Sequence, residues 1–207
     1  MVEPIVYLID DDVAVRDSLS LLIGSVGLHV RAYADVNQFL LDFKPDAVCC
    51  LILDIRMPGI SGLSFQDSLK ERGVSIPIIF ITGHGDLAQC TRAFKAGAID
   101  FLLKPVAEQA LIDCVQKSIN ISQETFNQRR FEEGILNRVS RLTEREKLVL
   151  ESLVDGLPNK VIAVNLGVSV RTVETHRANA IEKLDATSIA ECIKIQLAYQ
   201  DILSKSH

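Results

Sequence analysis

The sequence predicts an α/β fold, a doubly wound sheet of five parallel strands, followed by a small all-α module of four helices. The first observation is that five short apolar runs alternate with stretches of helical apolar spacing, up to about residue 122. The second is that these runs lack polar alternation, which is typical of strands that helices cover on both faces. The third is that residues 142–199 contain helical patterns and no strand signal.

The apolar runs are the expected strands of the sheet, and an amphipathic stretch follows each of them. Parallel strands need such crossover segments, and a helix is the usual one. In sheets of this kind, ligands bind outside the carboxyl ends of the strands, near the point where the strand order reverses. The expected strands cover residues 5–9, 30–33, 47–53, 76–81 and 99–103.

A polar segment without a dense apolar face, NISQETFNQRRFEEGILNRVS, separates the sheet from the helical module. We interpret it as a linker that is helical or partly ordered. The expected domains are therefore 1–122, with the linker at 123–140 and the helical domain at 141–207. Thr143 and Glu146 form a capping-box pattern at the start of the helical domain. The caps expected for its later helices are Asn159, Ser169, and Thr187 or Ser188.

Composition is that of an ordinary globular protein: of 207 residues, 48% are hydrophobic and 24% are charged, and no apolar run could cross a bilayer. The amino-terminal stretch MVEPIVYLIDDD has acids where an export signal would have a basic and then an apolar segment. The five cysteines lack metal-type spacing, so we expect reduced thiols, mostly in the core. These features predict a cytoplasmic protein without membrane partners.

The net charge of −5 by itself argues against nucleic-acid binding, but the acidity is confined to the first part of the chain. From Arg138 onward there are 10 Lys and Arg against 9 Asp and Glu, whereas residues 1–137 have 12 against 18. The helical domain could therefore approach DNA. Its weak charge predicts modest affinity for one copy, and hence paired domains on paired half-sites.

Polar side chains end four of the five expected strands, and the parallel sheet brings those ends together. Converging carboxylates repel one another unless a cation joins them, and magnesium prefers an all-oxygen site. A lysine and a hydroxyl beside such a metal would complete a site for a transferring phosphoryl group. The residues at these ends are Asp10, Asp11, Asp12, Asp54, Thr82 and Lys104.

Asp54 is the best candidate for a nucleophile at this site. No glycine-rich GxxxxGK[ST] loop is present, so nucleotide binding is not supported. An aspartate can itself attack phosphorus and form an acyl phosphate. Asp54 stands alone before a Pro-Gly turn, whereas Asp10 and Asp11 are adjacent and suit a metal. The simpler alternative is that a lone aspartate after a strand starts a turn or caps the next helix.

The motifs LIDDD, LILDIRMPGISG, IFITGHGD and AGAIDFLLKP occur in that order over residues 1–122. With them, this part of the chain resembles the receiver domain of two-component response regulators, which implies a flavodoxin-like fold and magnesium-dependent phosphorylation by a sensor histidine kinase. The resemblance implies that Asp54 is the phosphoacceptor. It also implies that Asp11, Asp54 and the backbone carbonyl of Arg56 bind magnesium or manganese, with Asp10 as a supporting acid.

The same resemblance assigns the remaining receiver residues. Thr82 and Phe101 match the residues that switch position on phosphorylation, and Lys104 matches the phosphate-binding lysine. The Lys104–Pro105 bond is expected to be cis. Arg56 and His84 each lie two residues beyond a site residue, and we hypothesise from this placement that they tune the lifetime of the acyl phosphate.

Residues 169–184, SVRTVETHRANAIEKL, form an amphipathic helical pattern after a short helix and a tight turn. This layout is that of a helix-turn-helix, whose second helix enters the major groove of DNA. Val173, Ala180, Ile181 and Leu184 are expected to face inward. The opposite side could equally be a solvated polar face, which is common for an isolated helix.

The segment from LTEREKLVL to LDATSIAE resembles the LuxR-type DNA-binding domain, which together with the receiver places the chain in the NarL/FixJ class of response regulators. The resemblance implies backbone contacts from Lys160, Arg171, Thr172 and Arg177. It implies base contacts from Glu174, Thr175 and Asn179. Some relatives have lysine in place of Glu174, so Glu174 could accept from a cytosine or could instead hold Arg171 or Arg177.

The favoured function is a transcription factor in which phosphorylation drives dimerisation through residues 86–118, with a histidine kinase, double-stranded DNA and RNA polymerase as partners. Activity as an enzyme is expected only as self-phosphorylation from a phosphodonor and autodephosphorylation. Aspartyl phosphatases usually carry a second acid two residues after the nucleophile, where this chain has Arg56. A constitutive DNA-binding protein is the other alternative.

Overall fold

The computed structural model describes residues 3–83 and 87–205. The chain divides into two compact units, a first unit Met1–Asn127 and a second unit Gln128–His207. One continuous helix, α5 (Glu108–Ser140), occupies the segment that the sequence predicts as a linker, and the division between the units falls within it.

The first unit contains the predicted parallel sheet, with all five strands and the order β2-β1-β3-β4-β5. Strand β4 begins directly after Pro77, which has no N–H to give to a ladder. Both β3 and β4 extend one residue further than predicted, so Asp54 and Thr82 are the last residues of their strands. The strands are β1 (Ile5–Ile9), β2 (His29–Tyr33), β3 (Cys49–Asp54), β4 (Ile78–Thr82) and β5 (Asp100–Leu103).

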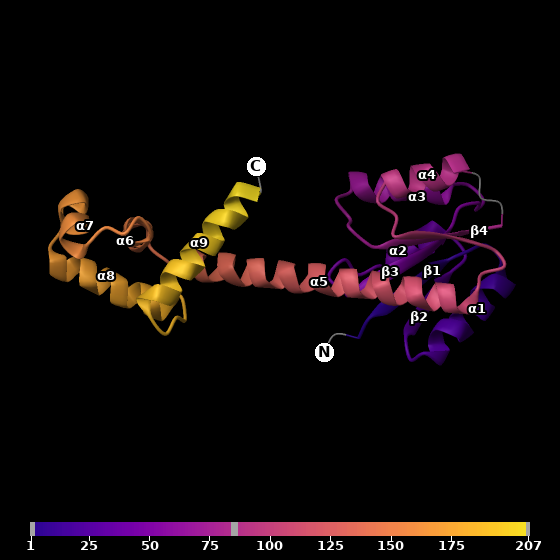
Figure 1. Ribbon diagram of the computed structural model, residues 1–207, viewed down its shortest axis with the longest axis horizontal. Coiled ribbons are helices and arrows are strands. Elements are labelled where there is room, and N and C mark those ends of the chain that lie inside the picture. Colours follow the sequence, from indigo (N-terminus) through magenta and orange to yellow (C-terminus); the bar gives the residue numbers. More distant parts are fainter. Residues whose placement is uncertain (1–2, 84–86, 206–207) are drawn as a thin grey trace. The chain divides into compact units, whose positions relative to one another are not determined.

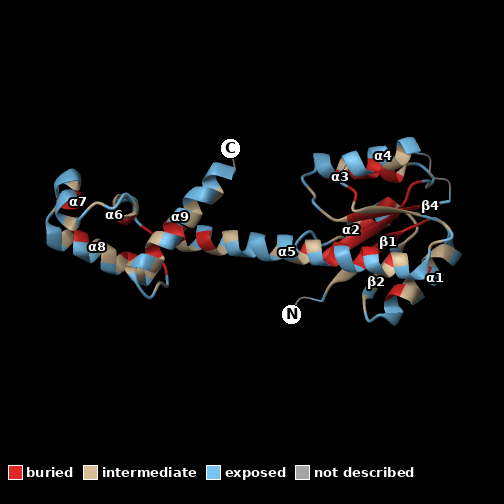
Figure 2. Ribbon diagram, viewed as in Figure 1, coloured by how far each residue is buried: buried red, intermediate tan, exposed pale blue. Residues whose placement is uncertain are grey.

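Helices cover both faces of the sheet, as Figure 1 shows for the first unit. On one face, residues of α1 and α5 such as Ile23 and Val115 pack with the strand residues Val6, Leu8 and Ile52. The opposite core contains residues of α2, α3 and α4. The central strands β1, β3 and β4 are almost fully buried (Figure 2), which explains why their sequences do not alternate. The edge strands β2 and β5 are partly exposed. The other helices of this unit are α1 (Val13–Ser25), α2 (Val36–Asp42), α3 (Gly62–Glu71) and α4 (Leu87–Lys95).

The cysteines are free thiols, as predicted, and only Cys90 is not buried. Burial and a hydrogen bond to Asp100 raise the pKa of Cys114 to about 11, so this thiol stays protonated at neutral pH. None of the described helices is both long enough and apolar enough to span a bilayer.

The second unit has the four predicted helices after α5. Thr143 and Glu146 form the predicted capping box, and the hydroxyl of Ser169 accepts from the Thr172 N–H as an N-cap. Gly167 adopts a left-handed conformation with φ 66°, which ends α7 and turns the chain into α8. The helices are α6 (Glu144–Val154), α7 (Asn159–Leu166), α8 (Val170–Lys183) and α9 (Ile189–Lys205).

The predicted cap at Asn159 is wrong. The N-cap residue of α7 is Pro158, which makes no side-chain cap hydrogen bond, and Asn159 is the first helical residue. The side-chain oxygen of Asn159 instead accepts from Arg177 in α8. A hydrogen bond from a charged donor is stronger than one from a backbone N–H, which accounts for this choice of partner.

Candidate functional site

Three carboxylates meet at the carboxyl ends of β1 and β3, which are neighbouring strands. Asp10 and Asp54 are buried and Asp11 is exposed, and one oxygen of each lies within 4.8 Å of the others. The strand register explains why Asp10 and Asp54 are neighbours. Ile9 pairs with Leu53, so the next residue of each strand end, Asp10 and Asp54, lies beside the other. Three of the acids grouped from the sequence, Asp10, Asp11 and Asp54, therefore lie together, whereas Asp12 caps α1.

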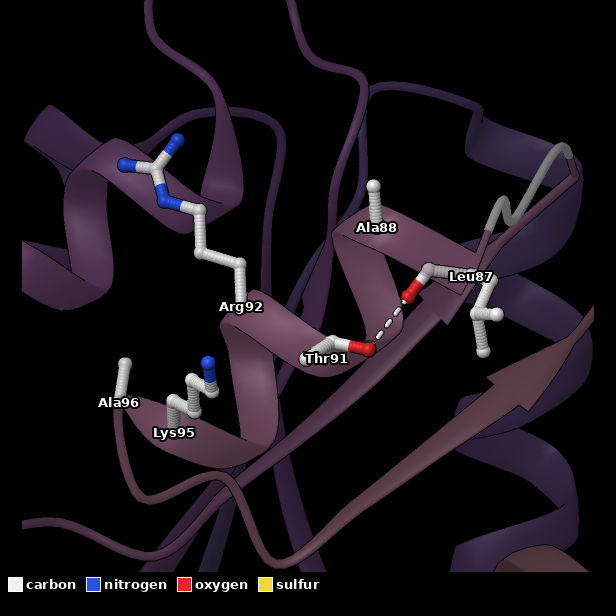
Figure 3. Close-up of a pocket in the computed structure, with 6 residues that line it drawn as sticks. All are labelled: Leu87, Ala88, Thr91, Arg92, Lys95 and Ala96. Atoms are coloured by element: carbon white, nitrogen blue, oxygen red, sulfur yellow. Dashed lines mark hydrogen bonds between the residues drawn. The ribbon is translucent and has the colours of Figure 1, made fainter.

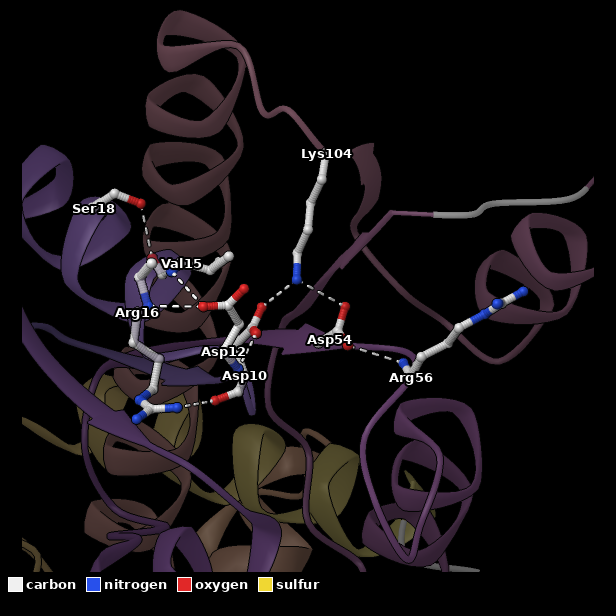
Figure 4. Close-up of polar contacts among 9 residues, drawn as sticks. Asp10, Asp12, Val15, Arg16, Ser18, Asp54, Arg56 and Lys104 are labelled. Atoms are coloured by element: carbon white, nitrogen blue, oxygen red, sulfur yellow. Dashed lines mark hydrogen bonds and ion pairs between the residues drawn. The ribbon is translucent and has the colours of Figure 1, made fainter.

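Lys104 reaches into this cluster from beyond the end of β5 (Figure 4). Its Nζ lies 2.6 Å from Asp10 Oδ2 and 3.3 Å from Asp54 Oδ1. The backbone N–H of Lys104 donates to the Thr82 carbonyl at 2.8 Å, which fixes the start of this side chain beside the end of β4. One ammonium thus bridges two buried carboxylates.

These contacts shift the pKa values of both partners. Burial raises the pKa of Asp54, the positive charge of Lys104 lowers it and the charge of Asp10 raises it, and the balance lies above the usual value. Burial lowers the pKa of Lys104, but its hydrogen bond to Asp10 and the charge of Asp54 outweigh burial and raise it. Lys104 is therefore positively charged, and Asp54 is held in a site where its own negative charge is costly.

The donor set fits a divalent cation such as magnesium. Three carboxylates converge, and among the described residues Lys104 is the cation that forms ion pairs with them. A second positive charge would offset the remaining repulsion. The ligands are oxygens, and the exposed Asp11 leaves room for the waters that magnesium keeps.

The backbone around the acids is held by contacts that the sequence analysis missed. Arg16 in α1 donates through Nη1 to the Asp10 carbonyl at 2.7 Å. The Asp12 carboxylate caps α1 by accepting from the N–H of Ala14 at 2.8 Å, and the Asp12 N–H donates to Asp10 Oδ1 at 3.0 Å. The feature of the sequence that could have indicated Arg16 is a basic residue one helical turn after the acids. Such a residue is common on any helix and therefore predicts little by itself.

Gly62 is the second missed residue, and its role is steric. A Cβ at this position would lie 2.3 Å from the Asp54 carbonyl oxygen, so any side chain here would displace the end of β3 or the start of α3. The Arg56 N–H donates to Asp54 Oδ2 at 3.1 Å within the same turn. Glycine therefore allows α3 to begin directly against the strand that carries Asp54.

The other predicted receiver residues lie around this cluster. Thr82 is fully buried at the end of β4, and Phe101 is partly buried in β5 and packs against the core. The Lys104–Pro105 peptide bond is cis, as predicted. The Arg56 side chain is exposed, and His84 lies outside the described residues.

The second unit presents the helix-turn-helix in α7 and α8. Val173, Ala180 and Leu184 are fully buried and Ile181 is partly buried, so the inward face of α8 is the predicted one. The predicted DNA-contacting residues all lie outside this buried core. Those that are exposed are Lys160, Arg171, Glu174 and Thr175, and those that are partly exposed are Thr172, Arg177 and Asn179.

The lysines and arginines of the second unit differ in whether they form ion pairs among the described residues. Several lysines and arginines form ion pairs there, for example Lys183 with Glu146 and Arg141 with Asp185. By contrast, none of the predicted DNA-contacting cations has an ion-pair partner within the part of the chain that the structure describes. These cations are Lys160, Arg171 and Arg177. Glu174 also lacks an ion pair among the described residues, so it does not hold Arg171 or Arg177.

An ion pair between the buried Glu146 and the partly exposed Lys183 anchors α6 to α8. Glu146 accepts from Lys183 Nζ at 2.8 and 3.0 Å, and it also accepts from the Thr143 N–H at 2.8 Å in the capping box. Burial raises the pKa of Glu146, but the hydrogen bonds from Lys183 and Thr143 outweigh burial and lower it. This contact fixes the carboxyl-terminal end of α8 on the rest of the unit.

Two family models match the chain. The model described as the response regulator receiver domain matches residues 6–116. The model described as bacterial regulatory proteins of the luxR family matches residues 140–196. The acidic cluster lies in the first match, and the helix-turn-helix lies in the second.

Proteins with this combination are similar over nearly the whole chain. The transcriptional regulatory protein FixJ of Azorhizobium caulinodans is 43% identical over 93% of this chain and 91% of that protein. The response regulator protein TodT of Pseudomonas putida is 40% identical over 96% of this chain and 88% of that protein. The solved structure of response regulator StyR matches with a TM-score of 0.88 at 40% identity, covering 93% of this chain and 98% of that one.

Proposed function

Because the chain belongs to the two-component response regulators of the NarL/FixJ type, we propose that phosphorylation of Asp54 controls binding of its LuxR-type domain to DNA. The protein is a transcription factor with a receiver domain and a DNA-binding domain. The observation that carries the proposal is the contact of one lysine with two buried acids, because it leaves Asp54 at the end of a strand with a fixed cation 3.3 Å from its oxygen.

In the proposed reaction, a carboxylate oxygen of Asp54 attacks the phosphorus of a phosphohistidine on a sensor histidine kinase. The new P–O bond forms as the P–N bond breaks, and the bonding electrons return to the imidazole nitrogen. Asp11, Asp54 and the Arg56 carbonyl would hold magnesium or manganese, with Asp10 in support. The bound metal supplies positive charge that stabilises the transferring phosphoryl oxygens.

Lys104 and Thr82 would recognise the product. Lys104 already lies between Asp10 and Asp54, so its ammonium can follow the charge as it moves from the Asp54 carboxylate to the phosphoryl oxygens. Thr82 ends the neighbouring strand β4 and offers a hydroxyl donor. A move of Thr82 toward the phosphoryl group would leave space for Phe101, and a few kcal/mol of differential energy between two states suffices for such a switch.

The proposed dimer forms through residues 86–118, of which residue 86 lies outside the described residues. Leu87, Phe94 and Leu103 are exposed apolar side chains in this region. An open pocket of about 800 Å³ lies along α4 (Figure 3), and Leu87 lines it together with Thr91 and Lys95. A second copy of this surface could cover these side chains and bring two DNA-binding domains together.

In the second unit, we propose that the cations of the helix-turn-helix meet the DNA backbone and that the polar residues of α8 meet base edges. Lys160, Arg171, Thr172 and Arg177 would contact phosphates. Glu174, Thr175 and Asn179 would lie in the major groove. RNA polymerase would be the later partner of the bound dimer. We also propose that the receiver domain ends at residue 122 and that the DNA-binding domain begins at residue 141.

The test compares the wild-type protein with Asp54→Asn in DNA binding, each with magnesium and with or without a small-molecule phosphodonor. We expect the donor to strengthen binding by the wild type and to leave Asp54→Asn unchanged. Asp46→Asn is the matched control, because it makes the same change at an exposed position outside the acidic cluster and outside residues 86–118. A constitutive DNA-binding protein would show equal binding in all arms, which would contradict the proposal.

A further inference from the structure

One hydrogen bond joins the two helices of the helix-turn-helix through their polar side chains. Arg177 Nη1 in α8 donates to Asn159 Oδ1 in α7 at 2.7 Å, across 18 residues of sequence. Asn159 is the first residue of α7 and next to the exposed Lys160. The bond therefore holds the charged end of Arg177 near the start of α7, close in sequence to a second cation.

The acceptor in this bond is a neutral amide, and that choice preserves the charge of Arg177. Among the described residues no carboxylate forms an ion pair with Arg177, in contrast to Lys183, which Glu146 neutralises. The bond uses one of the five N–H donors of the guanidinium. The other donors and the full positive charge can still serve an external anion.

An arginine side chain that is ordered before binding loses less conformational entropy when it contacts a phosphate. A free arginine side chain loses rotamer entropy when it is fixed, and a group fixed before binding does not lose that entropy again. The α7 helix begins without a side-chain cap, although Asn is a favoured cap residue and stands one position further on. Asn159 is thus used for Arg177 and not for its own helix.

We propose that Asn159 is a positioning residue for DNA binding, which orients the Arg177 guanidinium toward a backbone phosphate without neutralising it. This inference rests on the proposed function, because Arg177 is one of the proposed phosphate contacts. Asn159 itself need not touch DNA. The ligand is the phosphodiester backbone, so the effect is independent of base sequence.

The test is a double-mutant cycle on the full-length protein, with a short random-sequence DNA duplex as the probe. Arg177→Ala should weaken binding about tenfold, as expected for loss of a charge-assisted hydrogen bond. Asn159→Ala should weaken binding about three- to tenfold in the wild type and have no effect in Arg177→Ala. Asn165→Ala, an exposed asparagine in the same helix, is the control and should bind as the wild type does.

The salt dependence separates positioning from a structural role. Arg177→Ala should reduce the slope of log affinity against log salt by about 0.9, the value for one lost phosphate contact. Asn159→Asp keeps an acceptor for Arg177 but adds a negative charge, so it should reduce the slope similarly. The melting temperature of all variants should stay near that of the wild type.

Several results would overturn this inference. Unchanged or tighter binding by Asn159→Ala would show that the bond does not prepare Arg177, and wild-type binding by Asn159→Asp would show that the charge is not used. An equal loss from Asn159→Ala in the presence and absence of Arg177 would indicate a structural role. Absence of any binding by the wild type, with and without a phosphodonor, would contradict the proposed function itself.

Discussion

Replacement of Lys104 by methionine should destabilise the first unit unless a divalent cation is present. The Lys104 Nζ lies 2.6 Å from Asp10 and 3.3 Å from Asp54, and both carboxylates are buried. At an effective dielectric constant of about 20, the attraction amounts to about 6 kcal/mol with Asp10 and about 5 kcal/mol with Asp54, and the cost of desolvating the ammonium offsets a large part. We expect a net loss of about 2–4 kcal/mol in the free energy of unfolding without metal.

The assay is calorimetry of the full-length protein in EDTA and in magnesium. A loss of about 3 kcal/mol corresponds to a melting temperature about 10 °C lower for a unit of this size. Magnesium should raise the melting temperature of Lys104→Met more than that of the wild type, because the ion then supplies the missing charge. Equal stability of the two proteins in EDTA would refute the argument that Lys104 balances the buried acids.

Three further changes test other contacts. Asp54→Asn should abolish the hydroxylamine-labile phosphate in a phosphoprotein gel. It should also raise the melting temperature of the first unit at pH 7 in EDTA, because burial raises the pKa of Asp54 and its negative charge is therefore costly there; a lower melting temperature would contradict this. Gly62→Ala should destabilise the first unit by about 2–3 kcal/mol in urea unfolding, because its Cβ would meet the Asp54 carbonyl oxygen, and a neutral effect would mean that the backbone yields freely. Lys183→Met should destabilise the second unit by about 2–4 kcal/mol at pH 7, since Glu146 stays buried without its cation. The pKa of Glu146 is lowered in the folded state, so its contribution to the stability of the second unit is present above the unfolded pKa of about 4.5 and is lost as pH falls through the folded pKa. Carboxylates titrate between about pH 6 and about pH 3. A melting temperature of the second unit that does not change over this range would contradict this expectation.

The sequence was sufficient for the sheet and for most of the acidic cluster. Strand tips of a parallel sheet must meet, so Asp10, Asp54, Thr82 and Lys104 could be grouped from the order of apolar runs alone. The grouping could not show that Lys104 contacts both acids, because that depends on the reach of its side chain and on the turn that follows β5.

The residues that escaped prediction act through contacts that no periodicity encodes. Arg16 supports the Asp10 carbonyl from the next helix, and Gly62 matters because of a close approach between two backbones. Asn159 fits the sequence pattern of a cap, but Arg177 lies within reach only once α7 and α8 have packed. Local preference thus predicted the helix, and the tertiary structure decided the use of its first side chain.

Control of DNA binding by phosphorylation is tested most directly by selection of binding sites from random duplex DNA by the full-length protein in magnesium, with and without a small-molecule phosphodonor. We expect paired half-sites to be enriched chiefly in the presence of the donor, and this enrichment to be lost in Asp54→Asn. Equal enrichment of the same sites in both arms would contradict control by phosphorylation.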